Sequence, residues 1–104
     1  MQPRPRYLRV GLPVPLGQAF TYLLPPHLQA ERGARVLCEF GRRRVMGVVI
    51  DEVDGPPADL AESKIKPILA VVGQYPPLPI ELLDFLLTLA RYYLAPLGEV
   101  LRMA

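Results

Sequence analysis

The sequence has 104 residues, 51% of them hydrophobic, and a formal net charge of +2. This length predicts one domain over residues 1–104 with its own apolar core, and the thirteen prolines and eight glycines disfavour an all-helical bundle. A single cysteine, Cys38, excludes an internal disulfide and a CxxC metal site, which is typical of a reducing, cytoplasmic location. No apolar run approaches the roughly 20 residues that span a bilayer, so we expect no membrane partner.

Charge is distributed unevenly along the chain. Residues 1–50 hold eight arginines against two acidic residues, whereas residues 51–104 hold four basic against eight acidic residues, so the two halves carry net charges of +6 and −4. Clustered arginine is the electrostatic feature expected of a protein that binds a polyanion. The first half is therefore the candidate for nucleic-acid binding.

Two short strands are predicted near the beginning of the chain. Apolar residues alternate with glycine and proline over residues 9–16, and because proline cannot donate to a ladder, this pattern predicts an edge strand. Alternation resumes over residues 20–24 and places Phe20 and Tyr22 on one face with Thr21 on the other. The two aromatic side chains are either core residues or surfaces on which bases stack.

A hairpin with an arginine tip is predicted next. Residues 36–40 alternate, residues 45–50 form a β-branched apolar run, and Gly41-Arg42-Arg43-Arg44 lies between them. Three guanidinium groups at such a tip can pair with successive phosphates, while the glycine lets a backbone approach closely. The alternative interpretation is a solubilising turn. Because strand side chains alternate in direction, the three arginines need not all face one ligand.

The second half predicts a loop, a strand and a helix. Residues 51–63 contain two prolines, one glycine and five acidic residues without the fixed spacing of a metal site, which predicts a surface loop. Strand character returns over residues 65–72. The only long helix is predicted from about Leu78 to Leu94, with a polar stripe so narrow that most of its sides must be covered. Residues 98–104 begin another helical pattern, which we interpret as the start of a linker helix in a longer protein.

Residue types that carry catalysis are scarce. His27 and Ser63 are the sole histidine and serine, and neither a GxxxxGK[ST] loop nor a GxGxxG fingerprint occurs. His27 follows two prolines, and we interpret it as a solvated turn residue. We therefore expect that this chain is not an enzyme, has no metal site and carries no cofactor.

Several segments together resemble a known family. They are Val10-Gly-Leu-Pro-Val-Pro-Leu16, Phe20-Thr-Tyr-Leu-Leu-Pro25, Gly33-Ala-Arg-Val36, Phe40-Gly41 with its basic continuation, Lys64-Ile-Lys-Pro67 and Tyr92-Tyr-Leu-Ala-Pro-Leu-Gly-Glu-Val100. Their order along nearly the whole chain resembles the amino-terminal 3′-end DNA-binding domain of primosomal protein N′ (PriA), a replication restart helicase. Each segment is short, but the ordered set is specific.

The resemblance implies a binding site. In this family an aromatic-acidic-aromatic triplet, a Phe-Gly pair and a lysine form a shallow pocket for the nucleotide at the 3′ end of DNA. At the matching positions of this sequence stand Phe20, Thr21, Tyr22, Gly41 and Lys66. The arginines expected to contact phosphates are Arg42, Arg43 and Arg44.

Thr21 departs from the family pattern, because an aspartate is usual at this position. A threonine hydroxyl can donate and accept hydrogen bonds, but it has no charge and offers fewer acceptor sites than a carboxylate. The resemblance therefore implies either a weaker pocket or a different reading of the nucleotide.

We predict an α+β domain in which a small, strongly curved antiparallel sheet or partial barrel carries one long carboxy-terminal helix on its outside. The resemblance implies recognition of the 3′ end of the nascent leading strand at stalled or branched replication forks, with single-stranded or forked DNA bearing a free 3′-OH as the partner. It also implies further domains of the same ATP-dependent helicase, which would hold ATP and zinc, and contacts with primosome proteins and single-stranded DNA-binding protein. The alternative is an SH3-like or OB-like protein-interaction module that docks on the rest of a larger protein.

Overall fold

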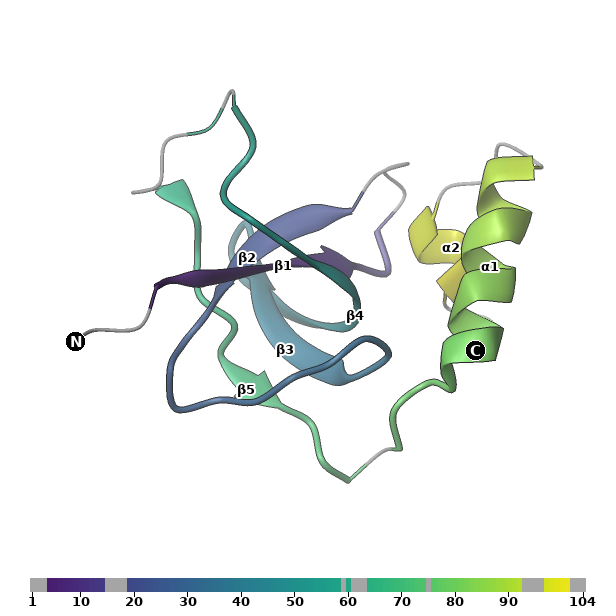
Figure 1. Cartoon of the computed structure of the whole chain (residues 1–104), viewed down its shortest axis with the longest axis horizontal. Helices are drawn as coiled ribbons and strands as arrows, with labels where there is room; N and C mark the ends of the chain where they lie inside the picture. The colour runs from purple at the N-terminus through teal and green to yellow at the C-terminus, as the bar shows by residue number, and fades with distance from the viewer. Residues whose placement is uncertain are drawn as a thin grey trace.

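The fold is one antiparallel sheet with two helices on one of its sides (Figure 1). The computed structural model describes residues 4–14, 19–58, 60, 64–74, 76–92 and 97–101. The described strands and helices are β1 (Arg6–Gly11), β2 (Phe20–Leu24), β3 (Arg35–Phe40), β4 (Arg43–Val53), β5 (Ala70–Val71), α1 (Ile80–Tyr92) and α2 (Leu97–Leu101). The predicted α+β class is confirmed. No helix among these residues is long and apolar enough to cross a membrane.

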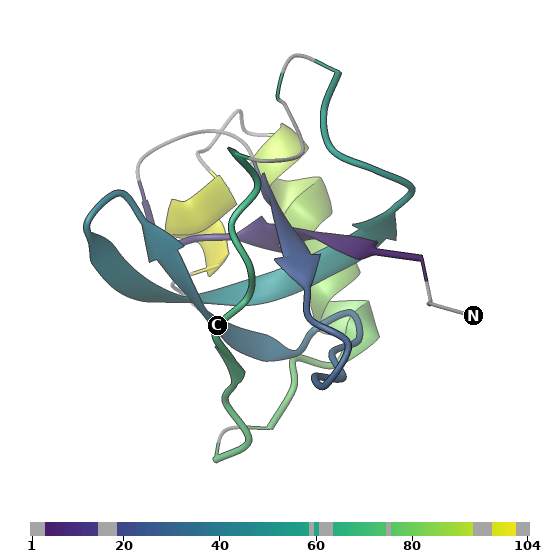
Figure 2. The ribbon, with the colours of Figure 1, turned by 90° about the vertical axis from the view of Figure 1, so that its left-hand side faces the viewer.

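The sheet has the strand order β2-β1-β4-β3-β5 and curves strongly without closing into a barrel (Figure 2). The segment before β5 hydrogen-bonds to β2 and so links the two edges of the sheet. The Leu23 amide donates to the Lys66 carbonyl at 2.9 Å, and the Leu23 carbonyl accepts from the Ile68 amide at 2.9 Å. The next amide, that of Leu69, donates to Leu37 of β3 at 2.8 Å. This one isolated bridge brings the amino-terminal edge strand β2 next to residues more than 40 positions later in the sequence.

The main core lies inside the curved sheet and follows strand alternation. Leu8 and Val10 of β1 face Tyr22 and Phe20 of β2 in the register, so these side chains share the inner face. Cys38 of β3 is fully buried there, and burial raises the pKa of its thiol to about 12. The fully buried side chains of this cluster are Leu8, Val10, Leu12, Val36, Cys38, Val49 and Ile68.

A second apolar cluster joins the helices to the other face of β4. Helix α2 lies between α1 and the sheet (Figure 1), and its Leu101 covers Gly11 so closely that a Cβ atom at Gly11 would come within 2.3 Å of that side chain. The members of this cluster are Val48, Leu78, Leu83, Leu86, Ala90, Val100 and Leu101. The outer face of α1 stays exposed, with Ile80 50% and Phe85 61% accessible. The prediction that most sides of this helix are covered is therefore wrong within the described residues.

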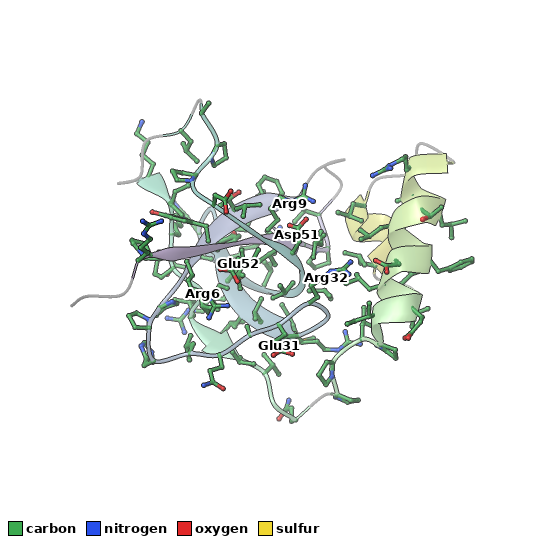
Figure 3. The ribbon with its side chains drawn as sticks, in the orientation of Figure 1. Arg6, Arg9, Glu31, Arg32, Asp51 and Glu52 are labelled. Atoms are coloured by element: carbon green, nitrogen blue, oxygen red, sulfur yellow. The ribbon has the colours of Figure 1, made fainter. Side chains whose placement is uncertain are left out.

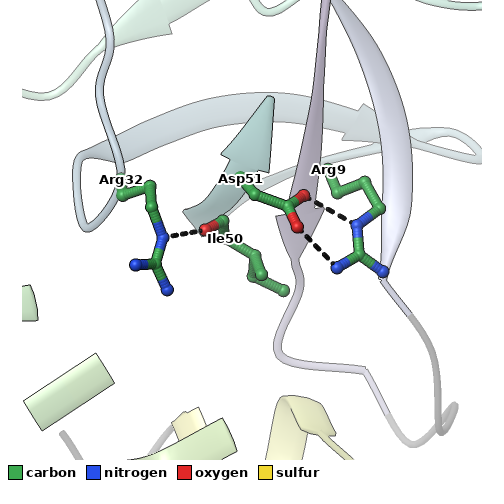
Figure 4. Close-up of polar contacts among 4 residues, drawn as sticks. All are labelled: Arg9, Arg32, Ile50 and Asp51. Atoms are coloured by element: carbon green, nitrogen blue, oxygen red, sulfur yellow. Dashed lines mark hydrogen bonds and ion pairs between the residues drawn. The ribbon is translucent and has the colours of Figure 1, made fainter. Parts of the chain in front are cut away.

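A β-bulge in β4 explains how the loop after β2 is held. The register between β1 and β4 shifts between Arg9 and Val10, so Ile50 has no partner in that ladder. Its carbonyl accepts a 2.6 Å hydrogen bond from Arg32 Nε instead (Figure 4). A second nitrogen of Arg32, Nη2, binds Asp84 of α1 at 2.6 Å. Arg32 thereby connects the loop, the bulged strand and the long helix.

Gly33 fixes the path of the chain into α1. Its φ of +89° lies in the left-handed region that favours glycine. The Gly33 amide donates to Val49 at 2.8 Å, and its carbonyl accepts from the Leu78 amide at 2.8 Å. A Cβ atom at this position would come within 2.3 Å of the Leu78 carbonyl oxygen. The residues before α1 can cross this point only because no side chain is present.

Several predicted boundaries differ from the structure. The strand expected as an edge is β1, which pairs on both sides, because it ends at Gly11, before the prolines that suggested an edge. The expected loop over residues 51–63 begins later, since β4 runs to Val53. The expected strand over residues 65–72 is reduced to β5. Predictions that fall on residues 15–16, 61–63, 93–96 and 102–104 lie outside the described residues.

Candidate functional site

A pocket of about 430 Å³ lies where β2, the β3–β4 hairpin and the segment before β5 meet. All five residues that the resemblance assigns to a nucleotide pocket line it, although they come from three separate parts of the chain. The full lining is Ala19, Phe20, Thr21, Tyr22, Glu39, Phe40, Gly41, Pro57, Leu60, Lys64, Ile65 and Lys66. The juxtaposition depends on the bridge between Leu23 and the segment 66–68.

Aromatic side chains form the wall that faces the core. The rings of Phe20 and Phe40 meet edge to face with centroids 5.1 Å apart and an interplanar angle of 65°, and both residues are half-buried. Tyr22 is only 4% exposed, and its hydroxyl donates a 2.6 Å hydrogen bond to the Glu39 carbonyl. Burial raises the pKa of Tyr22 to about 12. Tyr22 is thus a fixed part of the wall, whereas Phe20 and Phe40 retain accessible ring surface.

The hairpin turn brings the backbone to the rim of the pocket. Phe40 pairs with Arg43, which leaves Gly41 and Arg42 as a two-residue turn, and Gly41 has the positive φ of +61° that such turns favour at their first position. Lys66 Nζ donates a long hydrogen bond of 3.4 Å to the Gly41 carbonyl and lies 4.0 Å from Glu39 Oε2. The lysine is therefore held against the hairpin with its ammonium group exposed.

Thr21 lies beside the aromatic wall but points differently from its neighbours. Its register partner is Arg9, so strand alternation puts its side chain on the face opposite Phe20 and Tyr22. The residue is partly exposed, and its hydroxyl makes no hydrogen bond to another described residue. The packing is consistent with the predicted alternation, since Phe20 and Tyr22 pack against the main core and Thr21 does not.

Two groups of arginines in the first half differ in whether they form ion pairs. Arg6 and Arg9 are paired across the sheet with Glu52 and Asp51 of β4 (Figure 3), and each forms a two-point contact with distances of 2.7 to 3.1 Å. These arginines hold the pKa of both carboxyl groups below the usual range, chiefly through the side-chain hydrogen bonds. Much of the positive charge suggested by the sequence is therefore neutralised by acids of the second half.

The hairpin arginines form the other group. Arg42 lies in the turn, Arg43 and Arg44 open β4, and all three are exposed without an ion pair among the described residues. The register places Arg44 opposite Glu39 and Arg43 opposite Phe40, so the two point to different faces. The surface with unpaired positive charge therefore borders the pocket, where Lys64 and Lys66 add two more cations.

Comparisons with known proteins show which family the chain belongs to. Residues 9–104 match the family described as the 3′ DNA-binding domain (3′BD) of PriA. The chain belongs to this PriA 3′ DNA-binding domain family. It is similar to the replication restart protein PriA of Haemophilus influenzae, with 35% identity over 99 residues, 95% of this chain and 13% of that protein. It is also similar to PriA of Synechocystis, with 38% identity over 87 residues, 82% of this chain and 10% of that protein. The chain thus spans about a tenth of the length of these curated relatives.

Sequence reasoning missed several residues that line the pocket of this PriA 3′ DNA-binding domain. Glu39 was overlooked because one acidic residue in an apolar strand carries no motif. The available signal was alternation, since Cys38 and Phe40 take the inner face and leave Glu39 on the outer one, next to the turn. Pro57, Leu60 and Lys64 come from segments that no local pattern connects with β2.

Proposed function

We propose that this domain binds the 3′ end of a DNA strand, with the terminal nucleotide in the pocket and the preceding phosphates along the hairpin arginines. The observation that carries the proposal is the convergence of Phe20, Thr21, Tyr22, Gly41 and Lys66 on one pocket. They come from three segments far apart in the sequence, which the Leu23 bridge and the contact between the Phe20 and Phe40 rings hold together. Each resident group suits a part of a nucleotide, so the arrangement supports binding rather than covalent chemistry.

Different residues of the pocket would contact the base, the sugar-phosphate backbone and the phosphate charge. The half-buried rings of Phe20 and Phe40 offer apolar surface to a base or sugar. Gly41 lets the sugar-phosphate backbone approach the main chain, because nothing lies within 4 Å of where its Cβ would be. Lys66 supplies positive charge from one side of the turn, and the hairpin arginines supply it from the other.

In a longer protein, the same domain would place a helicase on forked DNA at the 3′ end of the nascent strand. The relatives are named replication restart proteins, and this chain covers about a tenth of their length. ATP and zinc binding would belong to other domains. Leu82 and Phe85, which share an exposed face of α1, support a second, compatible role in which the helix docks against protein.

Fluorescence anisotropy with a short labelled single strand tests the proposal. We expect tighter binding of a strand that ends in a 3′-hydroxyl than of the same strand with a 3′-phosphate. Lys66→Ala should weaken binding of the hydroxyl-ended strand by about tenfold, the scale of losing one charged contact. Arg91→Ala removes the same charge from the exposed surface of α1 and should change little. Equal losses in both variants would indicate non-specific electrostatic binding only.

A further inference from the structure

We propose that Glu39 is the residue that makes this pocket select a 3′-hydroxyl over a 3′-phosphate. Its carboxylate would accept a hydrogen bond from the terminal hydroxyl and repel a terminal phosphate. The inference rests on the proposed function and assigns its selectivity to one side chain. Glu39 provides the only carboxylate among the described residues that line the pocket.

The size of the pocket does not explain such selectivity. Gly41, Leu60, Lys64 and Lys66 on its rim are all exposed, so an added phosphate has room to extend into solvent. The cations of the rim would by themselves favour the phosphate, because it carries more negative charge than a hydroxyl. A pocket with two lysines therefore needs a negative group if it is to prefer the uncharged end.

The geometry places Glu39 where it can act in this way. Its main chain is fixed, because its carbonyl accepts the 2.6 Å hydrogen bond from the buried Tyr22 hydroxyl. Its side chain is 45% exposed, and its only ion pair among the described residues is the 4.0 Å approach to Lys66. At that distance no hydrogen bond forms, so both carboxylate oxygens remain available to a ligand hydroxyl.

The contact between Lys66 and Glu39 also lowers the positive charge inside the pocket relative to the hairpin. Lys66 lies between the Gly41 carbonyl and Glu39, so its charge is partly offset at the place where the DNA strand would end. Arg44, which shares the face of Glu39 across the hairpin, makes no ion pair with a described residue. Positive charge thus prevails along the hairpin, where internal phosphates would lie, and is reduced inside the pocket.

The test measures dissociation constants of wild type, Glu39→Gln and Glu39→Lys for one strand ending in either a 3′-hydroxyl or a 3′-phosphate. Glutamine keeps the shape and one acceptor oxygen but removes the charge. We expect Glu39→Gln to bind the phosphate-ended strand about tenfold more tightly and the hydroxyl-ended strand within a few-fold of wild type. Glu39→Lys should reverse the preference. Glu81→Gln, which removes a charge from the exposed side of α1, is the matched control and should retain the wild-type ratio.

The outcomes separate this inference from the proposed function. If wild type prefers the hydroxyl and Glu39→Gln keeps the same ratio, the selectivity resides elsewhere and the role of Glu39 is overturned while 3′-end binding stands. If wild type binds both strands equally, or neither, the proposed function and the inference are overturned together. Thermal unfolding of each variant confirms that the exposed substitutions leave the fold intact.

Discussion

At the scale of single residues, the pocket combines groups that the fold immobilises with groups that remain accessible. Tyr22 is fixed by burial and by its hydrogen bond to the Glu39 carbonyl. Thr21, Glu39 and Lys66 expose polar atoms beside it. Rigid walls with few mobile polar groups limit the conformational entropy lost on binding, which suits the proposed binding of one terminal nucleotide.

The Thr21 hydroxyl is the first group to test at this scale. Thr21→Val keeps the shape and strand propensity but removes the hydroxyl, so thermal unfolding should be nearly unchanged while binding of a 3′-hydroxyl end weakens by roughly 0.5–1.5 kcal/mol. Thr21→Asp restores the family residue and should tighten binding modestly for that end only. Anisotropy titrations of the three proteins provide the measurement. If valine binds as well as threonine and aspartate shows no dependence on the end, Thr21 is not part of the site.

At the scale of elements, the β3–β4 hairpin is the candidate track for phosphates. Replacing Arg42, Arg43 and Arg44 together by alanine should weaken binding of all sequences alike and should reduce the salt slope by about 0.7 for each lost contact to a single strand. Because Arg44 shares the face of Glu39 and Arg43 does not, the single Arg44→Ala variant should account for more of the loss. Titrations at several salt concentrations measure this. An unaltered slope in the triple variant would reduce the hairpin to a solubilising turn.

Gly33 controls how α1 is attached to the sheet. Gly33→Ala combines a left-handed φ, which costs roughly 1–2 kcal/mol for a residue with a side chain, with a clash against the Leu78 carbonyl. We expect a loss of at least that amount in the free energy of unfolding, measured with urea. Gly73→Ala is the matched control, because an added Cβ there meets nothing within 4 Å and the backbone has no positive φ. Similar stability of the two variants would contradict the proposed anchoring.

At the scale of the whole molecule, ion pairs between the two halves of the sequence make stability depend on pH. The pKa values of Asp51 and Glu52 are lowered in the folded state, so protons bind the unfolded chain more tightly. Their contribution is fully present above the unfolded values near pH 4 and is lost as the pH falls through the lower folded values. Arg9→Gln should reduce the loss of unfolding free energy on acidification. Arg42→Gln should leave that loss unchanged, because Arg42 has no ion pair among the described residues.

The limits of sequence reasoning follow from the range of each interaction. Alternation over residues 20–24 and 36–50 is local, so it located β2 and the hairpin and oriented Thr21. The interior place of β1 depends on pairing with β4, about 40 residues later in the sequence, which no local pattern encodes. The pocket residues were found through an ordered resemblance, because Lys66 reaches Phe20 through the long-range Leu23 bridge, which no local pattern predicts. Alternation puts Glu39 on the outer face of β3, but only the folded structure shows that this face borders the pocket.

Because Cys38 is buried, the rate at which its thiol reacts measures how often the sheet opens. The only thiol in the sequence lies fully inside the main core, and its raised pKa keeps it protonated at neutral pH. A thiol-reactive dye can therefore label the native protein only when β3 separates from its neighbours, and the labelling rate measures that opening without any engineered probe. A DNA strand in the adjoining pocket would bind only the protein whose sheet is intact. At a free DNA concentration [L], it should therefore slow labelling by the factor 1 + [L]/Kd. The chemistry of one buried sulfur atom would then report DNA occupancy through kinetics, independently of any label on the DNA.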